Sequence, residues 1–275
     1  MKTKASVILA ALSVLLSVTV FSGCVKSEDA VGTAMNIPIK TGYGMYESLA
    51  SDLNAKADKY KKELESKLKK SSEKKSIVKR EMSENFYGLL YDFDNNGTKE
   101  LLTYSYNNKT EDPENLYSIY TIKNNQLKTV VKNRKNYISY VGNERGCVGI
   151  ASKNGKNYLF EVKSNAPTDF SEVRRTYNYT VYNITNSGLK KLNTAKWVEV
   201  NSAIGKKYHK EYPKAYTKSQ YKIDGKKVDK TKFMNFINSF KLKNLKKEKA
   251  VEKDGYYITS SASAPDKLLK QVKKL

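Results

Sequence analysis

The chain has 275 residues and a formal net charge of +23, from 51 Lys and Arg against 28 Asp and Glu. Two cysteines, Cys24 and Cys147, are too few for a disulfide framework, and one histidine, His209, excludes a metal centre built from several imidazoles. We expect Cys147 to be a buried small hydrophobe and His209 to be a surface residue, and we predict no catalytic residues. A surface this basic favours polyanionic partners, such as anionic wall polymers or lipid head groups.

Residues 1–23 have the pattern of a lipoprotein signal peptide. A basic start is followed by an apolar run from Ala5 to Phe21, which ends on small residues. The tetrapeptide Phe21-Ser22-Gly23-Cys24 resembles the bacterial lipobox, in which the Cys thiol receives a diacylglycerol before the signal is cut. The resemblance implies lipid on Cys24, and each buried methylene of that lipid adds about 0.8 kcal/mol to membrane binding. We therefore expect an extracytoplasmic protein anchored to the cell membrane, with no nucleic-acid partner; an uncleaved N-terminal anchor is the alternative.

A flexible tether over residues 24–44 and a long helix are expected next. The tether is predicted because the residues of this segment are mostly small or polar. The helix, of about 25 residues, is predicted because apolar side chains recur at steps of three and four. These side chains are Leu49, Leu53, Ala57, Tyr60, Leu64 and Leu68. We expect the amphipathic face to pack on the body of the protein, with a partner coiled coil as the alternative; from Ser71 to Glu84 the pattern loosens.

From Asn85 the apolar period changes from 3.6 to 2, which predicts antiparallel strands and hairpins. Together with the long helix they form a predicted domain over residues 45–200. The predicted strands are Phe86–Tyr91, Glu100–Tyr106, Tyr117–Ile122, Leu127–Lys132, Ile138–Val141, Cys147–Ser152, Tyr158–Val162, Tyr177–Ile184, Leu189–Leu192 and Trp197–Val200.

One hairpin pattern occurs twice in this domain. Tyr117–Lys128 matches Tyr179–Lys190 at the Tyr, Ile or Val, Asn, Leu and Lys positions. A repeated hairpin unit suggests stacked, blade-like units, although two or three copies cannot close a propeller. The predicted fold is therefore mainly β (α+β), an antiparallel meander or a few blade-like units with one long N-terminal helix.

Residues 201–275 predict a small α+β tail packed on the β domain. Asp224-Gly225 is a type I′ hairpin pair between two short strands, and Asp229 has the position of a helix N-cap. The helix that follows has an apolar stripe of Phe233, Phe236, Ile237 and Phe240. A final amphipathic helix is expected over residues 265–275.

The loop after the first predicted strand carries the strongest chemical signal. Oxygen-bearing side chains stand at its positions 1, 3, 5 and 9, with Gly97 at position 6, which suits Ca²⁺ because that ion takes six to eight oxygen ligands. The predicted ligands are the side chains of Asp92, Asp94, Asn96 and Glu100 and the carbonyl of Thr98. Asn96 adds no charge, so the site should be weak; the structural alternative is an Asn-Gly hairpin turn with solvated acids.

The same stretch carries a family resemblance. Its Asp-x-Asp-x-Asn-Gly-x-x-Glu spacing between strands resembles the hairpins of integrin-type and related bacterial propeller repeats. More closely, Tyr87–Leu102 resembles a segment of uncharacterised lipoproteins and secreted proteins of clostridia-like bacteria, and residues 221–233 resemble the tail of that group. The resemblance implies an extracytoplasmic, mainly β protein and carries no known activity.

Three function classes follow from these observations. The leading hypothesis is a lipid-anchored protein of the cell envelope that binds or scaffolds, with a possible structural calcium ion. The alternative is a glycan-acting enzyme, which needs two carboxylates about 5–10 Å apart in a cleft. Its candidate acids are Glu84, Asp92, Asp94, Glu100 and Glu161. A solute-binding receptor is the third class.

Overall fold

The computed structural model describes one compact unit within residues Lys40–Leu275. The described residues are 42–69, 71–107, 114–136, 145–165, 173–185, 187–201, 217–249, 256–260 and 262–275. The predicted signal peptide with Cys24, the predicted strand Ile138–Val141 and His209 lie outside them. In the part of the chain that is described, no helix is both long and apolar enough to cross a membrane.

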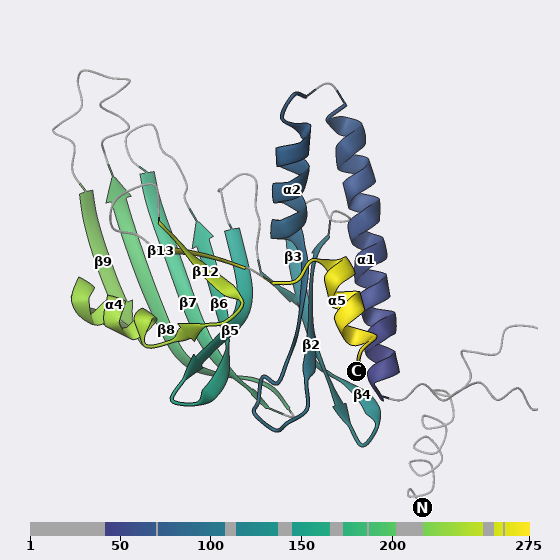
Figure 1. The fold of residues 1–275 in the computed structure, drawn as a ribbon. Helices are drawn as coiled ribbons and strands as arrows, with labels where there is room; N and C mark the ends of the chain where they lie inside the picture. The colour runs from purple at the N-terminus through teal and green to yellow at the C-terminus, as the bar shows by residue number, and fades with distance from the viewer. Residues whose placement is uncertain are drawn as a thin grey trace, which may run out of the picture. The chain divides into compact units, whose positions relative to one another are not determined.

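The chain is mainly β, with antiparallel sheets, a long N-terminal helix and a small C-terminal helix, as the sequence predicts (Figure 1). The helices are α1 Gly42–Lys67, α2 Lys74–Asn85, α4 Lys230–Asn238 and α5 Pro265–Val272. The strands of the first half are β1 Phe86–Tyr91, β2 Glu100–Asn107, β3 Glu114–Lys123, β4 Gln126–Lys135, β5 Arg145–Lys153 and β6 Lys156–Asn165. The remaining strands are β7 Val173–Thr185, β8 Gly188–Asn201, β9 Thr217–Ile223, β10 Lys226–Val228, β11 Lys241–Leu242, β12 Leu245–Lys249 and β13 Tyr256–Ser260.

Two antiparallel meanders form the centre of the fold. The first sheet has the order β1-β2-β3-β4. The second has the order β10-β9-β8-β7-β6-β5-β11, so that the chain after residue 200 extends the sheet begun by β5. β12 and β13 form a separate pair.

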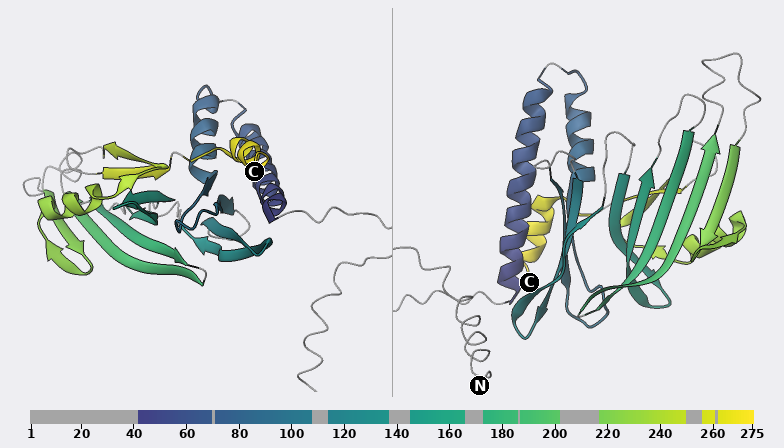
Figure 2. Two further views of the ribbon diagram at one scale, coloured as in Figure 1. Left: turned by 60° about the horizontal axis from the view of Figure 1, so that its bottom comes forward. Right: turned by 180° about the vertical axis from the view of Figure 1, so that it is seen from behind.

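Alternate side chains of these strands enter different cores, which arranges the elements in layers (Figure 2). An inter-sheet core lies between the two sheets and contains Tyr87, Leu89, Phe93, Leu102, Tyr104, Tyr117, Ile119, Val148, Ile150, Leu159, Tyr182 and Ile184. The other face of the first sheet packs on α1 and α5, where Tyr46 and Leu268 are fully buried. The other face of the second sheet packs on α4, around Trp197 and Phe233.

The predicted repeat is also a repeat of strand pairing. The pairs that flank the two turns are equivalent; they are Ile122–Leu127 and Ile184–Leu189. In both hairpins the second strand carries an extra residue three positions after the Leu of this pair, Val130 in β4 and Leu192 in β8; β4 has a second irregularity between the pairs of Tyr117 and Ile119. A β-bulge of this kind bends and twists its strand. The two meanders therefore share a local distortion as well as a sequence pattern.

Several boundaries differ from the prediction. Residues 42–44, assigned to the tether, begin α1, and Gly42 N–H donates to the Asn125 side-chain oxygen at 2.8 Å. The sequence did not predict helix α2. Only two of its residues, Val78 and Asn85, are buried, so it has no apolar stripe of helical period. The two segments predicted around Leu189 and Trp197 form one continuous strand, β8.

The C-terminal turn and cap agree with the prediction. Asp224 and Gly225 both have positive φ, 48° and 79°, as a type I′ turn requires. The Asp229 side chain accepts a hydrogen bond from the Lys232 N–H at 2.7 Å and thereby caps α4.

Candidate functional site

The loop between β1 and β2 is folded around its own acidic side chains. The Asp92 carboxylate accepts hydrogen bonds from the N–H groups of Asn96, at 3.0 Å, and Gly97, at 2.9 Å. Asn95 and Gly97 have φ values of 62° and 87°, which Asn and Gly tolerate better than other residues. Positive φ at Asn95 and Gly97 thus lets the loop wrap tightly enough to bring its N–H groups onto Asp92.

Three carboxylates converge in this loop. One carboxylate oxygen from each of Asp92, Asp94 and Glu100 lies within 4.8 Å of the others. Asp92 and Asp94 are half-buried, while Glu100 is 1% exposed. Like charges at this separation repel each other, so the cluster favours either a bound cation or a proton.

The pKa values of the cluster reflect this crowding. Burial, together with the charges of Asp94 and Asp92, raises the pKa of Glu100 from 4.5 to about 7. Burial is also the main reason that the pKa of Asp94 is raised, and the charge of Asp92 adds to it. The hydrogen bonds that Glu100 accepts from Phe93 N–H, at 2.7 Å, and from the Thr121 hydroxyl, at 3.2 Å, oppose the rise without cancelling it.

The other two predicted ligands take part in the hydrogen bonds of the turn. The Asn96 side-chain oxygen accepts a hydrogen bond from the Thr98 N–H at 2.7 Å, and its amide nitrogen donates to Asp94 at 2.8 Å. The Asn96 amide and the Thr98 N–H therefore close the turn beside the three carboxylates.

Two other layers of the fold hold the ends of the loop. The Asn157 side chain, from β6 of the second sheet, donates to the Asp92 carbonyl at 2.9 Å. The Tyr46 hydroxyl, from α1, lies 3.0 Å from the Lys99 carbonyl and 3.0 Å from the Tyr120 carbonyl. Sequence reasoning missed both anchors, because they lie far along the chain from the loop.

The donor set of the loop fits a hard divalent cation. All three converging groups are carboxylates, and Ca²⁺ binds oxygen ligands of this kind. A fit to zinc is poor, since zinc sites usually include Cys or His ligands and neither residue type occurs in the loop. Asp92, Asp94 and Glu100 are thus the residues that could hold Ca²⁺.

Glu161, the remaining buried candidate acid, belongs to a different cluster in the inter-sheet core. It is 2% exposed and accepts hydrogen bonds from the Tyr182 hydroxyl, at 3.0 Å, and the Asn136 side chain, at 3.2 Å. The Arg134 guanidinium lies 3.7 Å from Glu161 and donates to the Tyr182 hydroxyl at 2.6 Å. These contacts give Glu161 a structural role, in which a buried charge is paired and hydrogen-bonded.

Cys147 is buried, at 6% exposure, in the core between the second sheet and α4, as the sequence predicts. Glu84 lies near the end of α2 and is half-buried. Neither residue lies with the carboxylate cluster of the loop.

Comparison of the chain with known families, curated proteins and solved structures gives no significant match.

Proposed function

We propose that this protein is an exported, lipid-anchored module of the cell envelope that binds or scaffolds, and that its β1–β2 loop holds a structural calcium ion. The observation that carries the calcium proposal is the convergence of Asp92, Asp94 and Glu100 within 4.8 Å. Export and lipidation rest on the sequence of the first 24 residues. Membrane attachment would run through lipid on Cys24.

The positions of the acids favour a binding module over a glycan-acting enzyme. A glycosidase needs an acid and a second carboxylate facing each other across an open cleft. Here three candidate acids share one tight loop, and Glu161 is enclosed by Tyr182, Asn136 and Arg134. A solute receptor is less well supported, because the described residues do not form two α/β lobes.

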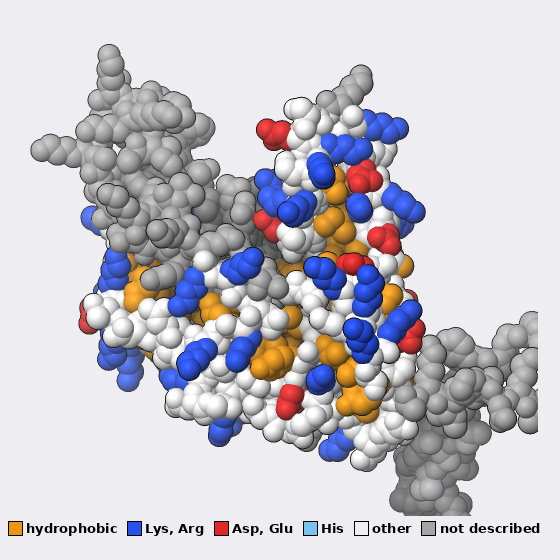
Figure 3. Space-filling model, in the orientation of Figure 1, with side chains coloured by type: hydrophobic (Ala, Val, Ile, Leu, Met, Phe, Trp, Pro, Cys, Tyr) orange, Lys and Arg blue, Asp and Glu red, His pale blue; other side chains and the backbone are white. Residues whose placement is uncertain are grey.

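The excess of basic side chains supports partners with negative charge. Lys and Arg are spread over the face shown in Figure 3 and outnumber the Asp and Glu side chains among them. Anionic wall polymers and lipid head groups both carry the charge that such a surface attracts.

Calorimetric melting of the full chain, in calcium and in a chelator, tests the site. At a calcium concentration ten times Kd, binding stabilises the fold by about 1.4 kcal/mol, which is a shift of a few degrees for a domain of this size. Asp94→Asn keeps an acceptor for the Asn96 N–H but removes a ligand charge, so we expect it to abolish the shift. We prefer it to Asp92→Ala, which would also leave the Gly97 N–H without its acceptor, whereas the Asn96 N–H would keep Asp94.

Asp224→Asn is the matched control, because it removes one negative charge from another hairpin turn. It should leave the calcium shift intact. Identical melting curves of the unaltered chain in calcium and chelator would rule out the site.

A further inference from the structure

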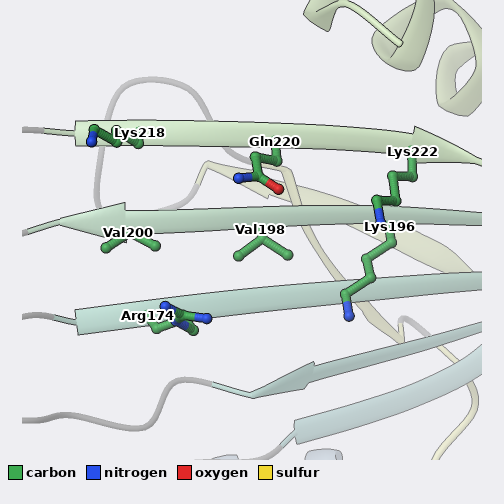
Figure 4. A pocket seen from close by; sticks show the side chains of 7 residues that line it. All are labelled: Arg174, Lys196, Val198, Val200, Lys218, Gln220 and Lys222. Carbon is green, nitrogen blue, oxygen red and sulfur yellow. The ribbon is translucent and has the colours of Figure 1, made fainter. Parts of the chain in front are cut away.

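Three neighbouring strands of the second sheet align basic and neutral side chains in regular rows. β8 pairs with β7 on one side and with β9 on the other, and directly paired residues point to the same face of a sheet. The rows across β7, β8 and β9 are Arg174–Val200–Lys218, Thr176–Val198–Gln220 and Asn178–Lys196–Lys222. Figure 4 shows seven of these side chains on one face of the strands.

The third row extends onto the strands at either side. Lys163 of β6 is paired with Asn178, and Lys227 of β10 is paired with Lys222. Four lysines therefore stand at one level across five strands, which lie about 4.8 Å apart. We call these residues, Lys163, Lys196, Lys222 and Lys227, the lysine row.

The centre of the lysine row is electrostatically unfavourable in the protein alone. Lys196 and Lys222 are direct cross-strand partners, and like charges in this arrangement destabilise a sheet. Among the described residues, no carboxylate lies within 4 Å of either ammonium group. Of the nearby acids, Glu161 contacts Lys163 at 3.5 Å, and Asp224 accepts hydrogen bonds from Asn193 and Thr194.

The lysine row borders a groove. A cavity of about 370 Å³ is lined by Arg174, Lys196, Val198, Val200, Lys218, Gln220 and Lys222. Cations stand at both ends of this lining, and the Val side chains and the Gln220 amide lie between them. On the same face of β7, Tyr182 and Ile184 are covered by the inter-sheet core, whereas Arg174 and Asn178 are exposed.

We propose that an extended, phosphate-bearing wall polymer lies along the lysine row, with successive phosphodiester groups on its lysines, and enters the groove at Lys196 and Lys222. A row of cations across five strands matches a chain of repeated anions better than a single small anion, which could reach two ammonium groups at most. A flat bilayer fits poorly, because the groove is concave. The binding surface follows from the fold alone. Only the natural source of the polymer rests on the proposed envelope location.

The binding of purified poly(glycerol phosphate) to the full chain, in nonionic detergent, tests this proposal. Lys196→Gln/Lys222→Gln should weaken binding by about tenfold and make the dependence of log Kd on log salt shallower by roughly 1–2, by analogy with phosphate neutralisation in nucleic acids. The matched control, Lys61→Gln/Lys62→Gln, removes two exposed charges from α1 and should change Kd by less than about twofold.

Equal losses in the two double variants would overturn the proposal, because net charge alone would then explain binding. Parallel titrations with phosphatidylglycerol vesicles and single-stranded DNA separate the other sources of phosphate. If the groove variant loses binding to vesicles or DNA but keeps polymer binding, the proposal is wrong.

Chemical acetylation of lysines gives a second readout that does not depend on variants. Bound polymer should protect Lys196, Lys222 and Lys227, and leave Lys61 and Lys62 reactive. Uniform protection would contradict the groove. Both measurements are made with and without calcium and need no lipid on Cys24, so their failure is distinct from failure of the proposed envelope function.

Discussion

Glu100 accepts a hydrogen bond from the Phe93 N–H at 2.7 Å, from the far end of the loop that the two residues enclose. The contact seals a ring in which Glu100 is almost fully buried beside Asp92 and Asp94. A carboxylate in this position is stabilised by the Phe93 N–H and destabilised by burial and by its acidic neighbours. Burial is the largest effect, and the pKa of Glu100 is raised from 4.5 to about 7.

A pH dependence of stability follows. Because the pKa of Glu100 is higher in the fold than in the unfolded chain, its contribution to stability is complete below pH 4.5 and is lost as the pH rises through about 7. In a chelator, Glu100→Gln should therefore melt a few degrees above the unaltered protein at alkaline pH, and the gap should close toward pH 4.5. Gln can still accept from Phe93 N–H. Melting curves against pH check this, and parallel curves for the two proteins would contradict it.

The anchor is tested at Cys24. Cys24→Ser removes the thiol that would receive the diacylglycerol, so the variant should appear in the medium or remain uncleaved instead of fractionating with the membrane. Inhibition of the lipoprotein signal peptidase should leave a larger precursor of the unaltered chain. A membrane fraction that neither treatment changes would count against lipidation. The control is Cys147→Ser, which replaces a buried cysteine and should leave membrane attachment unchanged.

Loss of the hydroxyl should change the free energy of unfolding differently at two tyrosines of the inter-sheet core. The Tyr87 hydroxyl accepts from Val148 N–H at 3.0 Å and lies 3.1 Å from the Val148 carbonyl. Tyr87→Phe leaves that buried N–H without its acceptor, which costs about 1–3 kcal/mol. The Tyr117 hydroxyl is buried with no hydrogen-bond partner among the described residues, so Tyr117→Phe should be neutral or stabilising. Urea unfolding of both variants measures the difference, and equal losses would contradict this account.

The packing of α5 on β1 depends on a glycine. A Cβ at Gly88 would lie 2.1 Å from Leu268 Cδ2 and 3.1 Å from the Leu102 carbonyl oxygen. Gly88→Ala should therefore displace α5 and raise the hydrogen exchange of its amides. Leu268→Ala alone should cost about 2–5 kcal/mol by leaving a cavity. The double variant should be less destabilised than the sum of the two, because the smaller side chain makes room for the new Cβ. Strict additivity would mean that the two residues do not compete for space.

Local signals in the sequence predicted much of the fold. An apolar run rich in aromatic residues placed β1 at Phe86–Tyr91, and Asp224-Gly225 placed the β9–β10 turn. These features depend on neighbouring residues, whose backbone preferences act over a few positions. The repeat also predicted two equivalent hairpins, since Tyr117 and Tyr179 begin the same pattern.

Features that depend on distant contacts were not predictable in the same way. Helix α2 carries few apolar residues. Its last residue, Asn85, is buried and accepts a hydrogen bond from the side chain of Asn115, 30 positions away. The paired environment of Glu161 is assembled from Arg134 and Tyr182, which lie on strands of different sheets. For the loop, sequence spacing identified the three carboxylates but not the hydrogen bonds that the Asn96 amide makes with the Thr98 N–H and with Asp94.

The contacts of Asn157 and Tyr46 with the two ends of the loop bear on how quickly the site could fill. Both side chains hold loop carbonyls in place, so the ring already exists before an ion arrives. A preformed ring loses little chain entropy on binding. Calcium uptake would then be limited by encounter and by the stripping of water from the ion, and not by a slow ordering of the chain. Weak affinity in such a site would show itself as rapid release.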